Sequence, residues 1–157
     1  MAVQLVMFEE EQRQVLTVCD RLCRDANASV VFVIDKNGQL IATAGDASRL
    51  DSTSLASLVA GEIAATGGLA QLMGEKEFST LFHEGVRDHI HITIVASRVI
   101  LVVIFDSRSS LGLVRLRVRR HSEELGRIFE SLAQRTAERP SPLDEITDED
   151  IDNLFSV

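Results

Sequence analysis

The histidines are the residues whose types and spacing come nearest to a chemical site. His83, His89 and His91 are close in sequence, and the spacing of His89 and His91 places two imidazoles on one face of a strand. Two ligands do not complete a metal site, and the neighbouring His83-Glu84 has no clear geometric relation to the pair. We therefore expect no bound metal and interpret these residues as half-exposed strand histidines.

Other catalytic patterns are equally weak. The sequence contains neither standard Gly-rich phosphate loop. The segment Asp35-Lys36-Asn37-Gly38 is similar to the start of a calcium loop, but the later glutamate is missing. No nucleophile elbow supports a Ser-His-Asp combination. We predict no catalytic residue and no cofactor, which leaves a small-molecule enzyme as the weakest functional hypothesis.

Two cysteines, Cys19 and Cys23, are four residues apart and share one face of a predicted helix. A metal pair would need further ligands, and the chain has no third cysteine. We interpret both as small buried hydrophobic residues of a protein in a reducing cytoplasm.

Composition narrows the function further. The chain has 157 residues, of which 45% are hydrophobic, enough for one domain with a sizeable core. Its net charge of −8 argues against a nucleic-acid partner. No uninterrupted apolar run approaches ~18 residues, so we expect no membrane span. The start, MAVQLVMFEEEQRQ, becomes acidic at once and lacks a basic region, so we expect no signal peptide.

The hydrophobic periodicity predicts an α+β domain. Helices are expected over 8–26, 53–73 and 111–137, and strands over 29–35, 39–44, 78–85, 89–96 and 99–105. Asn37-Gly38 between two apolar runs predicts a hairpin with positive φ at both residues. The fully apolar strand 99–105 is expected at the centre of a five-stranded antiparallel sheet, with helices on its faces. We divide the chain into a domain over 1–139 and an acidic tail over 140–157.

The predicted helix over 53–73 has two contrasting faces. Leu55, Val59, Ile63, Leu69 and Met73 recur at helical spacing and are expected to face the core. The opposite face is small and uncharged, although each glycine in a helix interior costs roughly 0.5–1 kcal/mol relative to alanine. The simplest reason is the close approach of another backbone. The predicted partner-binding residues are Ser57, Ala60, Gly61, Ala64, Gly67, Gly68 and Gln71.

The tail has a second amphipathic segment beyond Pro140-Ser141-Pro142. Thr147 and Asp150 have the spacing of a capping box, and Ile146 and Ile151 that of a hydrophobic staple. These signals predict a short helix over 148–155 that orders on a partner, as a helix laid into a groove. Its predicted contact residues are Asp150, Ile151, Leu154 and Phe155. The alternative is a solubilising tail that has no partner.

Arginine is the main basic residue of the chain. The cluster Arg115, Arg117, Arg119 and Arg120 in the third helix is interpreted as a solvated face. Four others, Arg49, Arg87, Arg98 and Arg108, are expected at loops or strand ends, where an arginine finger could project.

The element order and the helix sequence together resemble the Roadblock family, in particular its bacterial members that partner Ras-like GTPases of the MglA type. The residues that carry this resemblance extend over nearly the whole chain. They are VCDRL at 18–22, VFVIDKNGQLI at 31–41, TSLASLVAG at 53–61, GGLAQL at 67–72, FHEG at 82–85, RVILVVIFD at 98–106, SLGLVRLR at 110–117 and DIDNLFS at 150–156.

This resemblance implies a GTPase-activating protein that acts in cell polarity and gliding motility, in the cytoplasm and enriched at a cell pole. It implies a homodimer joined through the third strands, with paired second helices that engage one GTPase. Activation would remodel the switch regions of the partner without an arginine finger, and GTP and Mg²⁺ would be held by the partner alone. The terminal helix would modulate nucleotide exchange or affinity. The alternative of a different class is a non-catalytic dimeric scaffold that recruits polarity or motility proteins.

Overall fold

The computed structural model describes residues 7–138 and 147–156 of the chain. The elements, in chain order, are α1 (Glu9–Asp25), β1 (Val30–Asp35), β2 (Leu40–Gly45), α2 (Ser52–Leu72), β3 (Thr80–Glu84), β4 (His89–Val95), β5 (Val99–Phe105), α3 (Leu111–Glu138) and α4 (Asp148–Phe155). The predicted α+β fold is confirmed, including its five strands and their order along the chain.

The five strands form one antiparallel sheet in the order β2-β1-β5-β4-β3. Every residue of β5 is buried, as expected for an apolar central strand covered on both faces. At the two edges lie β2 and β3, which leaves the outer backbone groups of β3 without a strand partner in this sheet.

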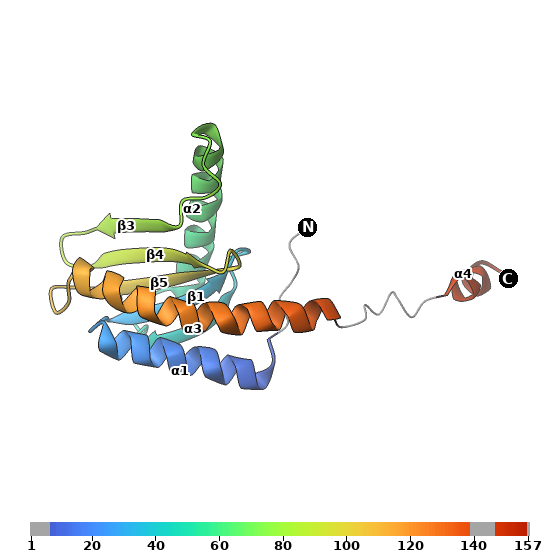
Figure 1. The fold of residues 1–157 in the computed structure, drawn as a ribbon, viewed down its shortest axis with the longest axis horizontal. Coiled ribbons are helices and arrows are strands. Elements are labelled where there is room, and N and C mark those ends of the chain that lie inside the picture. Colours follow the sequence, from blue (N-terminus) through green and yellow to red (C-terminus); the bar gives the residue numbers. More distant parts are fainter. Residues whose placement is uncertain (1–6, 139–146, 157) are drawn as a thin grey trace.

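Helices cover both faces of the sheet (Figure 1). On one face α1 and α3 pack side by side and enclose a core that includes Leu22, Leu125 and Phe129. Polar contacts also join these two helices: Arg21 Nη2 lies 2.7 Å from Glu124 Oε1, and His121 Nε2 lies 2.9 Å from Asp25 Oδ2. Within the described part of the chain, α2 is the helix that covers the other face.

The hairpin between β1 and β2 differs in detail from the prediction. Gly38 has a φ of +89°, whereas Asn37 does not lie in the positive-φ region. The turn is instead held by the Asp35 carboxylate, which accepts the backbone N–H groups of Asn37 and Gln39 at 2.9 Å each. A Cβ atom on Gly38 would lie 3.2 Å from Ser57 Cα. Glycine therefore serves both the turn conformation and the close approach of this turn to α2.

Both cysteines are buried free thiols on the inner face of α1, as predicted. Burial, together with the nearby charge of Asp20, raises the pKa of the Cys19 thiol to about 12.

The thiolate is the reactive form of a cysteine, so we expect Cys19 to react with a thiol reagent only when the protein unfolds locally or globally. Labelling should be slow in the folded protein and fast in urea. Rapid labelling of the folded protein at Cys19 would contradict this prediction.

The expectation of no membrane span rested on uninterrupted apolar runs and overlooked α2. Among the described residues, α2 is the one helix long and apolar enough to cross a membrane by length and composition, with a mean hydropathy of 1.3 over its best window. That criterion is weak evidence of a membrane helix. A helix that presents small, uncharged residues to a protein partner satisfies it equally well.

Candidate protein-docking site

The candidate site is the outer face of α2. The helix begins at the N-cap Asp51, whose carboxylate accepts the Ser54 backbone N–H at 3.1 Å and the Ser54 hydroxyl at 2.7 Å. The helix therefore begins at Ser52, one residue before the predicted start. The predicted end is confirmed, since Gly74 adopts a φ of +77° directly after the last turn.

The inner face of α2 is narrower than predicted. Val59 and Ile63 are buried against the sheet as expected, together with Ala56. Leu69 and Met73, which we expected in the core, are 53% and 65% exposed. Figure 1 shows the reason: α2 runs across the strands, and its C-terminal half projects beyond the edge strand β3. Periodicity continues along the helix, but the sheet beneath it ends.

The outer face of α2 divides into two halves at the helical angle of about 100° per residue. Ser57, Gly61, Ala64, Gly68 and Gln71 form the first half, which we call the small-residue half, and all five are exposed. A Cβ atom added to Gly61, Gly67 or Gly68 would meet nothing within 4 Å. Packing within this chain therefore does not require these glycines.

Two of the predicted partner-binding residues, Ala60 and Gly67, do not belong to the exposed small-residue half. Ala60 is only 9% exposed, because the turn at Gly38 covers it, with 3.5 Å between a Cβ on Gly38 and the Ala60 Cβ. Its small size is explained by the hairpin and not by a partner. Gly67 is partly exposed and lies at the border of the small-residue half.

The second half of the outer face is apolar and large. We call Leu58, Ala65, Leu69 and Leu72 the leucine half; all four are exposed, with Leu58 at 74% and Leu72 at 87%. Large exposed apolar surface of this kind marks an interaction site. The sequence prediction had missed this half. Its signal was the spacing of Leu58 and Leu72, which are separated by twice the seven-residue interval between Gly61 and Gly68.

The flanks of α2 show which neighbour each half adjoins. The turn at Gly38 lies beside the small-residue half, close to Ser57. On the other flank, Glu62 pairs with His83 of β3. The leucine half thus lies on the flank that contacts the open edge strand, and the small-residue half lies on the flank that contacts the hairpin.

The predicted C-terminal helix is present as α4. Its capping box is formed in both directions: Thr147 Oγ1 accepts the Asp150 N–H at 3.2 Å, and Asp150 accepts the Thr147 N–H at 2.9 Å. Ile151, Leu154 and Phe155 are all exposed. Ile146, the other half of the predicted staple, lies outside the described residues, as does the Pro140-Ser141-Pro142 segment.

Replacing Thr147 by alanine should weaken α4, because the cap then loses a side-chain acceptor at a cost of about 1 kcal/mol. We expect lower helicity in a peptide of residues 143–157, measured by circular dichroism in a helix-promoting solvent. Hydrogen bonds from Thr147 lower the pKa of Asp150, so the cap contributes above the ordinary aspartate pKa and is lost as pH falls through the lowered value. Equal helicity of the two peptides would show that the cap contributes nothing.

The histidines do not converge. His83 is exposed and His89 is half-buried, but His91 is 2% exposed, so the half-exposed interpretation was wrong for His91. The reason is the helix α3, which packs on β4 on the face that carries His91. Among residues 7–138 and 147–156, no group of three or more His, Cys, Asp or Glu residues could hold a metal ion.

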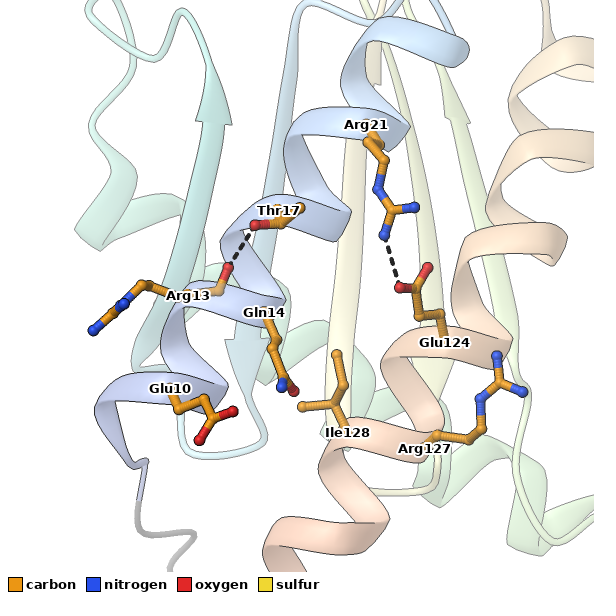
Figure 2. Close-up of a pocket in the computed structure, with 8 residues that line it drawn as sticks. All are labelled: Glu10, Arg13, Gln14, Thr17, Arg21, Glu124, Arg127 and Ile128. Carbon is orange, nitrogen blue, oxygen red and sulfur yellow. Dashed lines mark hydrogen bonds and ion pairs between the residues drawn. The ribbon is translucent and has the colours of Figure 1, made fainter.

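A shallow cleft of about 600 Å³ lies between α1 and α3 (Figure 2). Its lining residues carry both signs of charge: Arg13, Arg21 and Arg127 are basic, and Glu10 and Glu124 are acidic. The ion pair of Arg21 and Glu124 crosses the cleft, so these two charges neutralise one another. The cleft therefore provides no concentrated charge and no reactive group, and we do not place the function there.

Comparison with known proteins gives one family and close structural relatives. The family described as Roadblock/LC7 domain matches residues 14–105. Myxococcus xanthus MglB is 63% identical, with 82% of this chain and 96% of that chain covered and a TM-score of 0.77. The gliding protein MglB of Thermus thermophilus is 31% identical, with 83% and 99% covered and a TM-score of 0.77. A structure described as MglB with tetrameric arrangement is 30% identical, with 84% and 99% covered and a TM-score of 0.77. No curated protein matched the sequence.

Proposed function

This chain belongs to the Roadblock/LC7 family, and from that premise we propose that it is a GTPase-activating protein for a Ras-like GTPase of the MglA type. The observation that supports the proposal best is the small-residue half of α2, whose glycines no contact within the chain requires. Its relatives in Myxococcus and Thermus are MglB proteins, and the Thermus relative is described as a gliding protein. The proposed process is accordingly cell polarity and gliding motility, in the cytoplasm at a cell pole.

The proposed mechanism is selection of one switch conformation. A bare, rigid helix surface lets the backbone of a switch loop approach closely, whereas long side chains would hold it away. An activator works only if it binds the hydrolysis-competent arrangement better than the relaxed one. Moving such an equilibrium from 1:99 to 99:1 needs about 5.5 kcal/mol of differential affinity. Close packing over α2 would supply this without a chemical group from this chain.

A homodimer is the proposed working form, with two copies for each GTPase. The edge strand β3 offers unpaired backbone groups, and the leucine half of α2 lies on the same flank, next to the ion pair of Glu62 and His83. Pairing of two β3 edges would bring two leucine halves together, which buries surface that is costly to expose. The small-residue halves would then remain free for the partner. A relative whose structure is described as tetrameric supports self-association in this group.

No arginine of this chain is proposed to enter the active site of the partner. The Arg108 side chain is bound to groups of its own chain. Its Nε lies 3.0 Å from Asp106 Oδ1, and its Nη2 lies 3.2 Å from Ser29 Oγ. The hydrogen bond to Asp106 and the charge of that carboxylate raise the pKa of Arg108, as expected for a structural ion pair. Arg49, Arg87 and Arg98 are exposed, but they lie in loops and turns outside α2.

Alanine substitution tests the absence of a finger. We expect Arg49→Ala, Arg87→Ala, Arg98→Ala and Arg108→Ala each to change the hydrolysis rate at saturating activator by less than about threefold, because a true finger is worth 10³–10⁵ in rate. Single-turnover GTP hydrolysis measures this directly. A loss of a hundredfold or more at any one position, with binding retained, would identify a finger.

The C-terminal helix is proposed as a second contact with the GTPase that modulates nucleotide exchange or affinity. Four acidic residues and three exposed apolar side chains in α4 give it one charged and one apolar side. A short helix of this kind is marginal in water and gains stability on a partner groove.

GTP turnover by the cognate GTPase tests the proposal. We expect strong stimulation by the full chain, retained stimulation by a truncation after Arg139, and an altered exchange rate or affinity in the truncation.

The second candidate function is a non-catalytic scaffold, which the same exposed surfaces of α2 and α4 would also suit. Unchanged turnover with retained binding would support the scaffold and exclude activation.

A further inference from the structure

A second pocket lies on the opposite face of the sheet from α2, between α3 and the strands β3 and β4. Its volume is about 480 Å³. Six of its lining side chains can donate hydrogen bonds: Thr80, His91, Thr93, Arg115, Arg119 and Ser122. The remaining lining residues are Val118 and Glu123. The docking of a GTPase on α2 makes no use of this pocket.

His91, which lines this pocket, has a buried polar atom without a partner in the described part of the chain. The side chain is 2% exposed, and its Nε2 has no hydrogen-bond partner in the described part of the chain. Its Nδ1 lies 3.3 Å from Thr93 Oγ1. Burial, with the nearby positive charge of Arg115, lowers the pKa of His91, so the ring is neutral near pH 7. When the Thr93 hydroxyl donates to Nδ1, the proton of the neutral ring is on Nε2. A buried donor without an acceptor is costly, which points to an acceptor supplied from outside.

The groups around His91 are also donors. Ser122 Oγ is buried and has no partner within the described residues. Arg115 and Arg119, one helical turn apart on α3, bring two guanidinium groups to the same pocket, and neither forms an ion pair in the described structure. Glu123 is the single acidic lining residue, so the pocket carries a net positive charge in a strongly acidic chain.

We propose that this pocket binds the phosphate group of a small soluble phosphate monoester. A tetrahedral oxyanion has enough acceptor lone pairs for several donors at once, and arginine forks match its geometry. Arg115 and Arg119 would hold the charge, and His91 and Ser122 would donate to the same oxygens. The remaining volume would accept a small organic group. The inference does not rest on the proposed GTPase activation, but the pocket borders the proposed dimer contact, because Thr80 belongs to the edge strand β3.

Calorimetric titration of the full chain with inorganic phosphate and with glycerol 3-phosphate tests the site, at about 0.15 M salt, where the Debye length is about 8 Å. We expect saturable binding of both probes, weakened at least about tenfold by Arg115→Ala with Arg119→Ala, since charge-assisted bonds are lost. Arg120→Ala, on the same helix but outside the pocket, is the matched control and should change affinity less than twofold by the same principle.

The nitrogen chemical shifts of the His91 ring, measured by NMR, provide a second test. Non-specific charge effects at the protein surface would leave these shifts unchanged. We expect the Nε2 resonance to shift as phosphate saturates, and His91→Gln, which keeps an N–H donor, to retain more affinity than His91→Phe. If His91→Phe does not fold, His91→Gln and the arginine variants still decide the question. The proposal is overturned by no saturable binding of either probe, by equal losses in the Arg120→Ala control, or by an acidic peptide that occupies the pocket where phosphate does not.

Discussion

The double substitution Ala64→Arg and Gly68→Arg is expected to abolish binding of the GTPase while leaving the fold intact. Both positions are exposed on the small-residue half of α2, and a Cβ on Gly68 meets nothing within 4 Å. Arginine is a good helix former, so the substitution at Gly68 should favour the helix. Two long arginine side chains would hold the partner backbone several ångströms away from α2. They would also place two positive charges in the interface. We expect at least a hundredfold weaker binding, about 2.7 kcal/mol.

Gly112→Arg is the matched control for this test. Gly112 is also an exposed helical glycine with nothing within 4 Å of a Cβ, but it lies on α3, on the other side of the sheet. It should bind the GTP-loaded partner with unchanged affinity. Circular dichroism and thermal unfolding check that all variants fold. If the double variant bound the partner as well as the wild type does, the result would show that α2 is not part of the interface.

Glutamate at Leu58 and Leu72 is expected to dissociate the homodimer. These are the most exposed leucines of the leucine half, and burying one leucine contributes about 1.5–3 kcal/mol. A symmetric dimer would lose four leucines and gain four facing carboxylates. We expect the dissociation constant of the dimer to rise at least about a thousandfold, which is about 4 kcal/mol. Analytical ultracentrifugation over a dilution series measures this change.

Leu116→Glu provides the control for dissociation. Leu116 is an exposed leucine too, but it belongs to α3, which covers the opposite face of the sheet from α2. Its substitution should leave the sedimentation coefficient unchanged. A wild-type chain that is monomeric at all concentrations, or a Leu58 and Leu72 double variant that still dimerises, would place the interface elsewhere or exclude it.

Much of the fold could be predicted because periodicity and turn chemistry are local. The wholly apolar run at 99–105 indicated a strand covered on both faces, and β5 is that strand. Thr147 and Asp150 specified the start of α4 by their spacing alone. The glycines of α2 were recognised as lacking a local purpose, and their surroundings within the chain are indeed empty.

The errors arose where distant segments meet. Ala60 belongs to a packing contact with the turn at Gly38, which no pattern within α2 reveals. Leu69 follows the core period but lies beyond the edge of the sheet, because helical periodicity does not record where a sheet ends. His91 is buried by α3, although the strand pattern alone suggested a half-exposed residue. Each error reflects tertiary structure that overrides a correct local pattern.

The most direct test of the central claim is the structure of this protein bound to its GTPase loaded with a non-hydrolysable GTP analogue. We expect the switch loops of the partner to lie over Ser57, Gly61, Ala64 and Gly68 of a dimer joined through β3. The arginine near the γ-phosphate should come from the GTPase. A complex that leaves this surface of α2 exposed, or that places an arginine of this chain at the phosphate, would contradict the proposed mechanism.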